Sequence, residues 1–180
     1  MKKYIVIVSM LFVGLSHLIG QVDGGFSTVP VVNGKVVFEQ FILTDQSLSA
    51  VQKYASLQKW VKGKYSGNPL VSAIRFDDKN QSVTVSAKTD LGDVAGKTFM
   101  NYRFDLSVAS AGCILVIRDI TYQNTAQQGA SSFPKSSTAE QTITDQAVGA
   151  SGDEGQARSS IRKATLSFLN GLYKEVSGIF

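Results

Sequence analysis

The sequence leaves little room for catalysis or metal binding by histidine, because its 180 residues contain a single histidine, His17. His17 lies within an apolar N-terminal segment and leaves the protein if that segment is cleaved. Ser-His-Asp and Cys-His catalysis, and metal sites ligated by histidine, are then excluded from the mature chain. The lone cysteine, Cys113, opens an apolar strand pattern, where a buried thiol is expected rather than a nucleophile.

Two carboxylates could do chemistry without histidine. Asp105 and Asp119 fall on neighbouring predicted strands and could form the kind of carboxylate pair used in general acid-base catalysis. Arg103 and Arg118 are close to them in sequence. Cross-strand ion pairs among these four residues are the simpler interpretation.

A second acidic cluster, Asp77 and Asp78 with Asn80 nearby, could offer oxygen ligands to a calcium ion. Its spacing lacks the alternating pattern and the final glutamate of a calcium-binding loop. A solvated hairpin turn is therefore the favoured interpretation, and neither a metal site nor a cofactor is predicted.

Three aromatic residues, Tyr54, Trp60 and Tyr65, share one predicted helix and could form a platform for a sugar or a peptide. On a helix that packs against a sheet, such residues more often fill the core. Asp45 or Ser47 is expected to cap this helix, which should run to about Lys64. Its predicted apolar stripe comprises Leu48, Val51, Tyr54, Ala55, Val61 and Tyr65, with Trp60 at the margin. The rest of its surface is expected to carry Lys53, Lys59, Lys62 and Lys64.

Alternating patterns predict the strands that position these side chains. Asn33-Gly34 suits the type I′ turn of a hairpin, and a strand should follow over 35–43. One face of that strand would carry Val36, Phe38, Gln40 and Ile42, and the other Val37, Glu39, Phe41 and Leu43. Further strands are predicted over 70–76, 83–88, 100–108 and 113–122, with turns over 77–81 and 90–96. The clearest is 100–108, where Met100, Tyr102, Phe104, Leu106 and Val108 alternate with polar residues.

The segment from 123 to 156 is rich in Gln, Ser, Thr, Ala and Gly, which predicts a long polar loop. Within it, Ser137-Thr138-Ala139-Glu140 fits a capping box, so a short helix is predicted over 138–148. A final amphipathic helix is predicted over 157–176. Its apolar side would carry Ile161, Thr165, Phe168, Leu169, Leu172 and Val176.

The resulting order, β-α-β-β-β-β-α, predicts a two-layer α+β domain. Its antiparallel sheet of about five strands should have helices on one face and leave the other face open. The open face is the candidate binding site, through Lys88, Asn101, Arg103, Asp105 and Tyr122. An ordinary solvated sheet face would present the same residue types without any function.

These features together resemble a known family. The phrase Asn33-Gly34-Lys35-Val36-Val37-Phe38 opens the first strand, and the run from Tyr54 ends on Trp60 late in the first helix. Four strands and the island Thr138-Ala139-Glu140-Gln141 precede the terminal helix. The pattern, over about 29–176, is similar to DUF4468, a family of secreted Bacteroidetes proteins with a TBP-like fold. The resemblance implies a single TBP-like domain over 21–180 in the cell envelope. It implies no reaction or ligand, and a shared fold does not imply DNA binding.

Residues 1–20 have the organisation of a secretory signal peptide, with Lys2 and Lys3, an apolar run from Tyr4 to Ile19, and Gly20 at its end. The run is short for an uncleaved membrane anchor. Cleavage near Gly20 would export the mature chain to the periplasm, the outer surface or the medium, with only transient membrane contact through this segment. Its removal lowers the formal net charge from +4 to +2, which gives no electrostatic support for nucleic-acid binding.

Three hypotheses of function follow. The favoured one is a non-enzymatic binding or interaction module of the cell envelope, whose partner would be an envelope protein or a glycan. The first alternative is a histidine-independent hydrolase that uses Asp105 and Asp119. The second is a carrier that holds a small apolar ligand between helix and sheet.

Overall fold

The computed structural model describes residues 24–67, 72–94, 97–124 and 135–180 of the chain. The predicted signal peptide, its cleavage site near Gly20 and His17 lie outside these residues. Within the described ranges, no helix is both long enough and apolar enough to cross a membrane.

A six-stranded antiparallel sheet forms one layer of the protein. Its strands are β3 (Phe38–Leu43), β4 (Ser72–Asp77), β5 (Ser82–Asp93), β6 (Lys97–Ala109), β7 (Gly112–Asn124) and β8 (Lys135–Thr138). They follow the order β3-β7-β6-β5-β4, and β8 pairs with the same edge of β7 that β3 uses further along. A two-stranded hairpin of β1 (Val31–Val32) and β2 (Lys35–Val36) precedes β3. Its turn residues Asn33 and Gly34 have φ values of 51° and 76°, as a type I′ turn requires.

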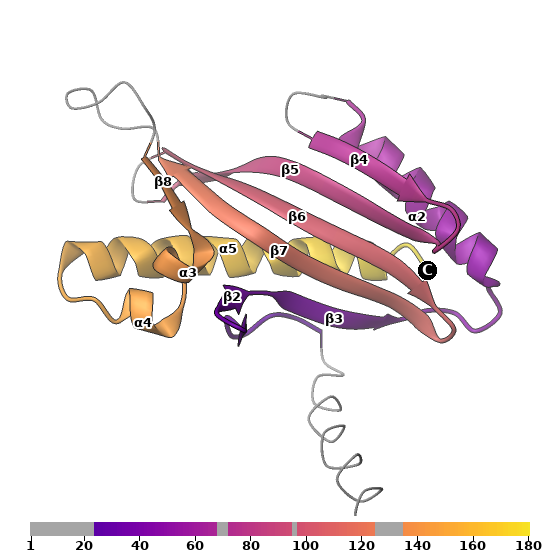
Figure 1. Ribbon diagram of the computed structural model, residues 1–180, viewed down its shortest axis with the longest axis horizontal. Coiled ribbons are helices and arrows are strands. Elements are labelled where there is room, and N and C mark those ends of the chain that lie inside the picture. The colour runs from indigo at the N-terminus through magenta and orange to yellow at the C-terminus, as the bar shows by residue number, and fades with distance from the viewer. Residues whose placement is uncertain (1–23, 68–71, 95–96, 125–134) are drawn as a thin grey trace, which may run out of the picture.

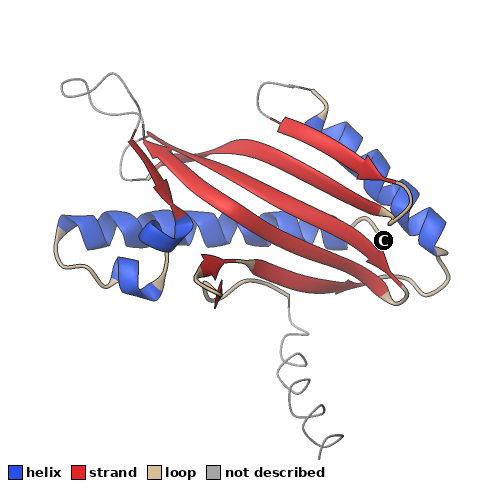
Figure 2. Ribbon diagram, in the orientation of Figure 1, coloured by secondary structure: helices blue, strands red, loops and turns tan. Residues whose placement is uncertain are grey.

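The second layer consists of helices on one face of this sheet. The long helices α2 (Ala50–Tyr65) and α5 (Asp153–Ser177) lie behind the strands in Figures 1 and 2, and the face toward the viewer is uncovered. Two single-turn helices, α3 (Ala139–Thr142) and α4 (Asp145–Val148), lead from β8 into α5. The predicted two-layer α+β architecture is therefore confirmed, with six strands in the sheet instead of about five.

The core lies between the layers because the strands alternate as their sequences predict. On β6, Phe104 and Leu106 are fully buried, and on β7 Leu115 and Ile117 are equally inaccessible. They meet apolar residues from the helices: Leu57 and Val61 of α2, and Leu169, Leu172 and Val176 of α5. Full burial of each such side chain contributes about 1.5–3 kcal/mol relative to leaving it exposed.

Helix α2 begins later, and faces the sheet with different residues, than its sequence pattern predicts. Its cap is Ser49, which forms a capping box with Gln52, so neither Asp45 nor Ser47 caps it. Val51 is 67% exposed, whereas Lys53 is 2% exposed. The Lys53 ammonium donates to the carbonyl of Ser110 at 3.1 Å, and its aliphatic stem covers apolar surface on the way. The predicted stripe was wrong at Val51, which is exposed, and at Lys53, which is buried. The carbonyl of Ser110, distant in sequence, makes burial of Lys53 favourable.

Two predicted loops contain regular structure. Strand β5 continues to Asp93 through an irregularity after Asp90. Residues 90–93 of the predicted 90–96 turn are therefore strand, while 95–96 lie outside the described residues. The predicted 123–156 loop contains the end of β7, then β8, α3, α4 and the start of α5, while 125–134 lies outside the described residues. Thr138 caps α3 together with Gln141, one residue later than the predicted box. Polar composition predicted loops here, but pairing with β7 makes β8 a strand.

Candidate functional site on the open face of the sheet

A charged network occupies the centre of the uncovered face. Asp105 Oδ2 accepts hydrogen bonds from Nε and Nη2 of Arg118 at 3.0 and 2.8 Å. The hydroxyl of Thr84 donates to Asp105 Oδ1 at 2.7 Å, and Nη2 of Arg103 lies 3.6 Å from the same oxygen. The predicted cross-strand ion pairing is thus confirmed for Asp105 and Arg118, while Arg103 approaches Asp105 along the same strand.

This network keeps the Asp105 carboxyl ionised. Partial burial acts to raise its pKa, but hydrogen bonds from Thr84 and Arg118, with the charges of Arg118 and Arg103, hold that pKa below its usual value. Both carboxylate oxygens already accept hydrogen bonds from neighbouring strands. A carboxylate so occupied suits a structural or recognition role better than proton transfer, for which a pKa near the working pH is best.

Asp119, the other predicted member of the pair, belongs to a β-bulge. On β6, Asn101 pairs with Thr121 but Arg103 pairs with Arg118, so β7 contains one extra residue at this point. Asp119 has a φ of 56°, a left-handed conformation that residues other than glycine rarely adopt. Asp105 pairs across the strands with Val116, three residues along β7 from Asp119, and its carboxylate is bound by Arg118 instead.

The bulge removes Tyr122 from the open face. Regular alternation after the buried Leu115 and Ile117 would place Tyr122 on the uncovered side, as predicted. The extra residue reverses the alternation, and Ile120 and Tyr122 are buried at 3% and 1% exposure. The Tyr122 hydroxyl lies 2.9 Å from the hydroxyl of Thr165 on α5. The predicted location of Tyr122 was wrong, and it is a core residue.

Lys88 and Asn101 lie on the open face as predicted, and both have partners there. Lys88 donates to Gln123 at 3.0 Å, and its ammonium lies 4.6 Å from the centre of the Phe99 ring. The amide of Asn101 donates to the hydroxyl of Thr121 at 3.4 Å. Their contacts tie β5, β6 and β7 together on the solvent side.

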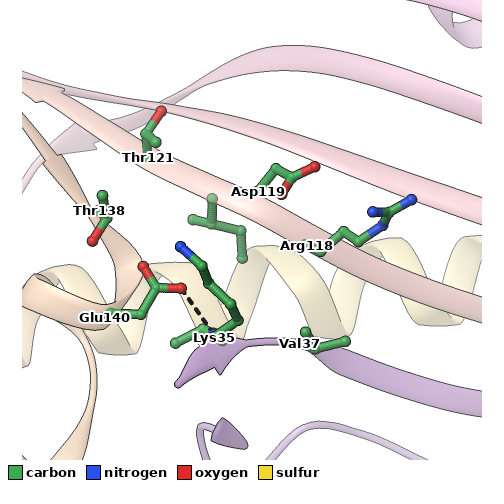
Figure 3. A pocket seen from close by; sticks show the side chains of 9 residues that line it. Lys35, Val37, Arg118, Asp119, Thr121, Thr138 and Glu140 are labelled. Carbon is green, nitrogen blue, oxygen red and sulfur yellow. Dashed lines mark hydrogen bonds between the residues drawn. The ribbon is translucent and has the colours of Figure 1, made fainter. Parts of the chain in front are cut away.

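A small cavity opens beside the bulge, where β7 passes from one edge partner to the other. Pairing with β3 ends at Phe38 and Ile117, and pairing with β8 begins at Thr121 and Thr138. The cavity measures about 360 Å³ and is lined by Lys35, Val36, Val37, Arg118, Asp119, Ile120, Thr121, Thr138 and Glu140. Figure 3 shows the Asp119 side chain directed away from Glu140.

Glu140 is the best-anchored polar group of this bulge cavity. Its Oε1 accepts the backbone N–H of Val36 at 2.9 Å. Partial burial acts to raise the pKa of Glu140, but this hydrogen bond, with others from its own N–H and from Thr138, holds that pKa below its usual value. The carboxylate thereby joins α3 to the hairpin strand β2. The contact spans 104 residues of sequence, so no local pattern could have predicted it.

An exposed apolar surface adjoins the charged network. Phe41 and Leu43, on the outer face of β3, are 46% and 67% exposed. Ile114 of β7 pairs with Phe41 and is half-buried beside it. We call Phe41, Leu43 and Ile114 the apolar corner. Sequence alternation placed Phe41 and Leu43 together on one face of this strand without assigning the core to either face. The structure shows that this face is the exposed one.

The apolar corner borders a free strand edge. The N–H of Val37 donates away from β7, to Pro30, at 3.3 Å, whereas that of Thr44 donates toward it, to Ala111. Because N–H directions alternate along a strand, those of Glu39, Phe41 and Leu43 point away from β7. Within the part of the chain that the structure describes, no strand pairs with this edge.

Most of the remaining sequence candidates are structural. Cys113 is fully buried, and burial raises the pKa of its thiol to about 12, so its predicted core position is confirmed. Asp77 accepts the N–H and the amide of Asn80 in the β4–β5 turn, as predicted for a hairpin. Tyr54 and Tyr65 are each 7% exposed. In the described ranges, no three acidic, histidine or cysteine side chains gather as a metal site would require.

Comparison with known proteins defines the fold. No protein-family model matches the chain, and no curated protein matches it. A TBP-like protein from Parabacteroides distasonis is similar in structure, with a TM-score of 0.72 and 20% identity, over 84% of this chain and 96% of that one. A DUF4468 family protein from Bacteroides ovatus has a TM-score of 0.69 and 21% identity, over 86% of this chain and 91% of that one.

The chain therefore has the TBP-like α+β fold. The resemblance to DUF4468 proteins that its sequence motifs carry is confirmed in the fold, which is the level that these identities support. A shared fold leaves the function to be argued from the surface itself.

Proposed function

We propose that this protein is a non-enzymatic binding module of the bacterial cell envelope, which docks an extended segment of a partner protein along β3. The single observation that carries this proposal is the apolar corner. Phe41 and Leu43 are large, exposed and adjacent on an edge strand. An exposed apolar cluster with a polar rim is a common mark of a protein interaction site.

The free edge of β3 favours an extended partner. Unpaired N–H and C=O groups on an edge strand form a template for another strand, and adding a strand provides affinity through main-chain hydrogen bonds. Phe41 and Leu43 would select apolar residues at alternate positions of the incoming strand. Glu39 lies on the same face of β3 as Phe41 and is exposed. It would favour a Lys or Arg opposite it on the incoming strand.

The hydrolase alternative has less support. It requires Asp105 and Asp119 to act together with separated pKa values. Asp105 instead accepts hydrogen bonds from Thr84 and Arg118 on both oxygens, and Asp119 belongs to the bulge. The carrier alternative requires space between the layers, where Leu57, Phe104 and Leu169 are fully buried in one core cluster.

Photo-crosslinking tests the proposed docking edge. The mature chain, 21–180, would carry p-benzoylphenylalanine in place of Leu43 and be incubated with envelope fractions from its own host. Val51 on α2 is the matched control position, because Leu43 and Val51 are each 67% exposed. A discrete adduct is expected from position 43 and none from position 51. Equal adducts from both positions, or no adduct from position 43, would contradict the proposal.

A second variant separates binding from folding. Phe41→Asp places a charge in the apolar corner, where Phe41 is 46% exposed, so the Tm should change little. The adduct at position 43 should be lost, and in the wild-type complex the amides of Glu39, Phe41 and Leu43 should gain protection from hydrogen exchange. An adduct that persists in Phe41→Asp would exclude the apolar corner as the docking surface.

A further inference from the structure

A groove on the helix side of the molecule supports a second, independent inference. It lies between α2 and the last turns of α5, which cover the same face of the sheet in Figure 1. Its volume is about 630 Å³, and its lining comprises Ser56, Lys59, Trp60, Gly63, Lys64, Glu175, Gly178 and Ile179. We call it the Trp60 groove.

One wall of this groove is an immobilised indole. Trp60 is half-buried, with its ring centre 5.8 Å from that of Tyr65 and 6.2 Å from that of Phe104. Contacts with two core rings fix the orientation of the indole, while part of it lines the open groove. A flat aromatic surface held in place at the water boundary suits stacking against the C–H face of a sugar ring, because stacking then costs little side-chain entropy.

Two exposed ammonium groups give the Trp60 groove its charge. Lys59 and Lys64 both line it, and Lys64 pairs with Glu175 across the two helices. The Lys64 ammonium also lies 5.8 Å from the ring centre of Trp60. Two lysines against one glutamate leave a net positive charge, which is complementary to an anionic ligand group.

The helix ends limit how much negative charge the groove can accept. Lys64 lies in the last turn of α2, and Glu175 and Gly178 lie at the end of α5. Helix C-termini carry partial negative charge and have carbonyl groups without intrahelical partners. Such carbonyls accept hydrogen bonds from hydroxyl groups and repel dense phosphate charge. A hydroxyl-rich ligand with an isolated carboxylate therefore fits better than a nucleotide or a phosphorylated headgroup.

Gly63 leaves the middle of the groove open. It lies within α2, where glycine destabilises a helix relative to alanine, and a Cβ at this position would meet no atom within 4 Å. The packing of the protein therefore gives no reason for a glycine here. Its missing side chain exposes the helix backbone between Trp60 and Lys64, where a ligand could approach it.

We infer that the Trp60 groove binds an acidic carbohydrate, whose ring stacks on Trp60 while its carboxylate pairs with Lys59 and Lys64. This inference does not depend on the proposed protein-docking edge, since no residue of β3 lines the Trp60 groove. The sugar hydroxyl groups would donate to the carbonyls at the end of α2.

Fluorescence titration tests this inference directly, because Trp60 is the only tryptophan of the chain. The mature protein would be titrated with tetragalacturonic acid, and with maltotetraose as the neutral probe. A saturable change in Trp60 emission is expected with the acidic probe, at a Kd of about 1 mM or tighter. Binding of the neutral probe should be at least tenfold weaker. Equal binding of both probes, or no response to the acidic probe at about ten times that concentration, would overturn the inference.

Matched glycine variants locate the site. Gly63→Leu should fill the groove and weaken binding at least tenfold, while the Tm stays equal or rises because leucine is the better helix former. Gly171 of α5 is the control, since it is exposed and its Cβ would also meet nothing within 4 Å. Gly171→Leu should bind as the wild type does. Wild-type binding by Gly63→Leu would exclude this groove.

Charge variants complete the test. Lys59→Gln should weaken binding of the acidic probe by several-fold and make that binding less sensitive to salt. Lys163→Gln removes a charge that is also exposed, on α5 and outside the groove lining, and should leave binding unchanged. Equal effects of the two variants would show a non-specific charge effect and contradict the assigned carboxylate contact.

Discussion

The two faces of the sheet use the same strands for different purposes. On β6, Phe104 is fully buried against the helices, while its neighbour Asp105 belongs to the charged network on the open side. Burial of apolar area is the larger contribution to stability, whereas partly exposed ion pairs contribute little. The open face is therefore freer to change for recognition without loss of the fold.

Strand β7 keeps apolar side chains on the covered face along its whole length only because of the bulge. Before it, the buried residues include Leu115 and Ile117, and after it Ile120 and Tyr122. Because of the extra residue at Asp119, the buried side chains change from odd-numbered to even-numbered positions. The bulge also separates the β3-paired half of β7 from the β8-paired half, and it creates the cavity between them.

The largest expected effect is on the covered face. Phe104→Ala should lower the free energy of unfolding by about 3–5 kcal/mol, because it removes a fully buried ring and leaves a cavity. Phe41→Ala removes the same ring from the open face of the same sheet, where 46% of it is exposed, and should cost less than about 1 kcal/mol. Urea unfolding measures both. Similar losses in the two variants would disprove the division between the faces.

A smaller effect tests whether Tyr122 belongs to the covered face. Tyr122→Phe removes the partner of the buried Thr165 hydroxyl, which should cost about 1–2 kcal/mol. The double variant Tyr122→Phe/Thr165→Val removes both polar groups and should recover part of that loss. Denaturant unfolding of the single and double variants makes the comparison. A Tyr122→Phe variant as stable as the wild type would contradict the buried hydroxyl pair.

Acid titration should reveal the charged network of the open face. The pKa of Asp105 is lowered in the folded state by Thr84 and Arg118, against the opposing effect of burial. The unfolded chain therefore binds a proton first, and stability present above about pH 4 is lost as the pH falls through the folded pKa. Asp105→Asn should be less stable than the wild type by about 1 kcal/mol at pH 7.

The same comparison at low pH distinguishes charge from shape. The difference between wild type and Asp105→Asn should shrink as the pH falls from about 4 through the lowered folded pKa, below which Asp105 is protonated in both states of the wild type. Urea midpoints measured from pH 7 to pH 2 provide the test. A difference that is constant over this range would mean that Asp105 stabilises the sheet by geometry alone.

The smallest effect concerns the bulge residue itself. Asp119→Gly should raise the free energy of unfolding by less than about 1 kcal/mol, because glycine adopts a φ of 56° without steric cost but loses more chain entropy on folding. Asp119→Ala is the control and should be destabilising. Thermal unfolding of both variants gives the comparison. A stabilised Asp119→Ala would argue that the left-handed conformation is not strained.

The sequence predicted the elements whose signals are local. Asn33-Gly34 marked a turn with two positive φ values, and alternation in 100–108 identified the buried face of β6. The helical spacing of Ile161, Leu169 and Val176 likewise identified the buried side of α5. Most of the proposed open-face site was also placed on the correct side of the sheet. These predictions hold because side-chain direction repeats every two residues in a strand and about every 3.6 in a helix.

Contacts between distant residues decided the rest. Lys53 is buried because the carbonyl of Ser110 accepts its ammonium, and β8 is a strand because β7 offers it an edge. The bulge at Asp119, which moved Tyr122 into the core, has no glycine to signal it in the sequence. By itself, then, the sequence determined the two long helices, the strands with clear alternation and most of their buried faces. Only the tertiary structure decided register, bulge and the surfaces left open, because each depends on partners that the chain brings together only when it folds.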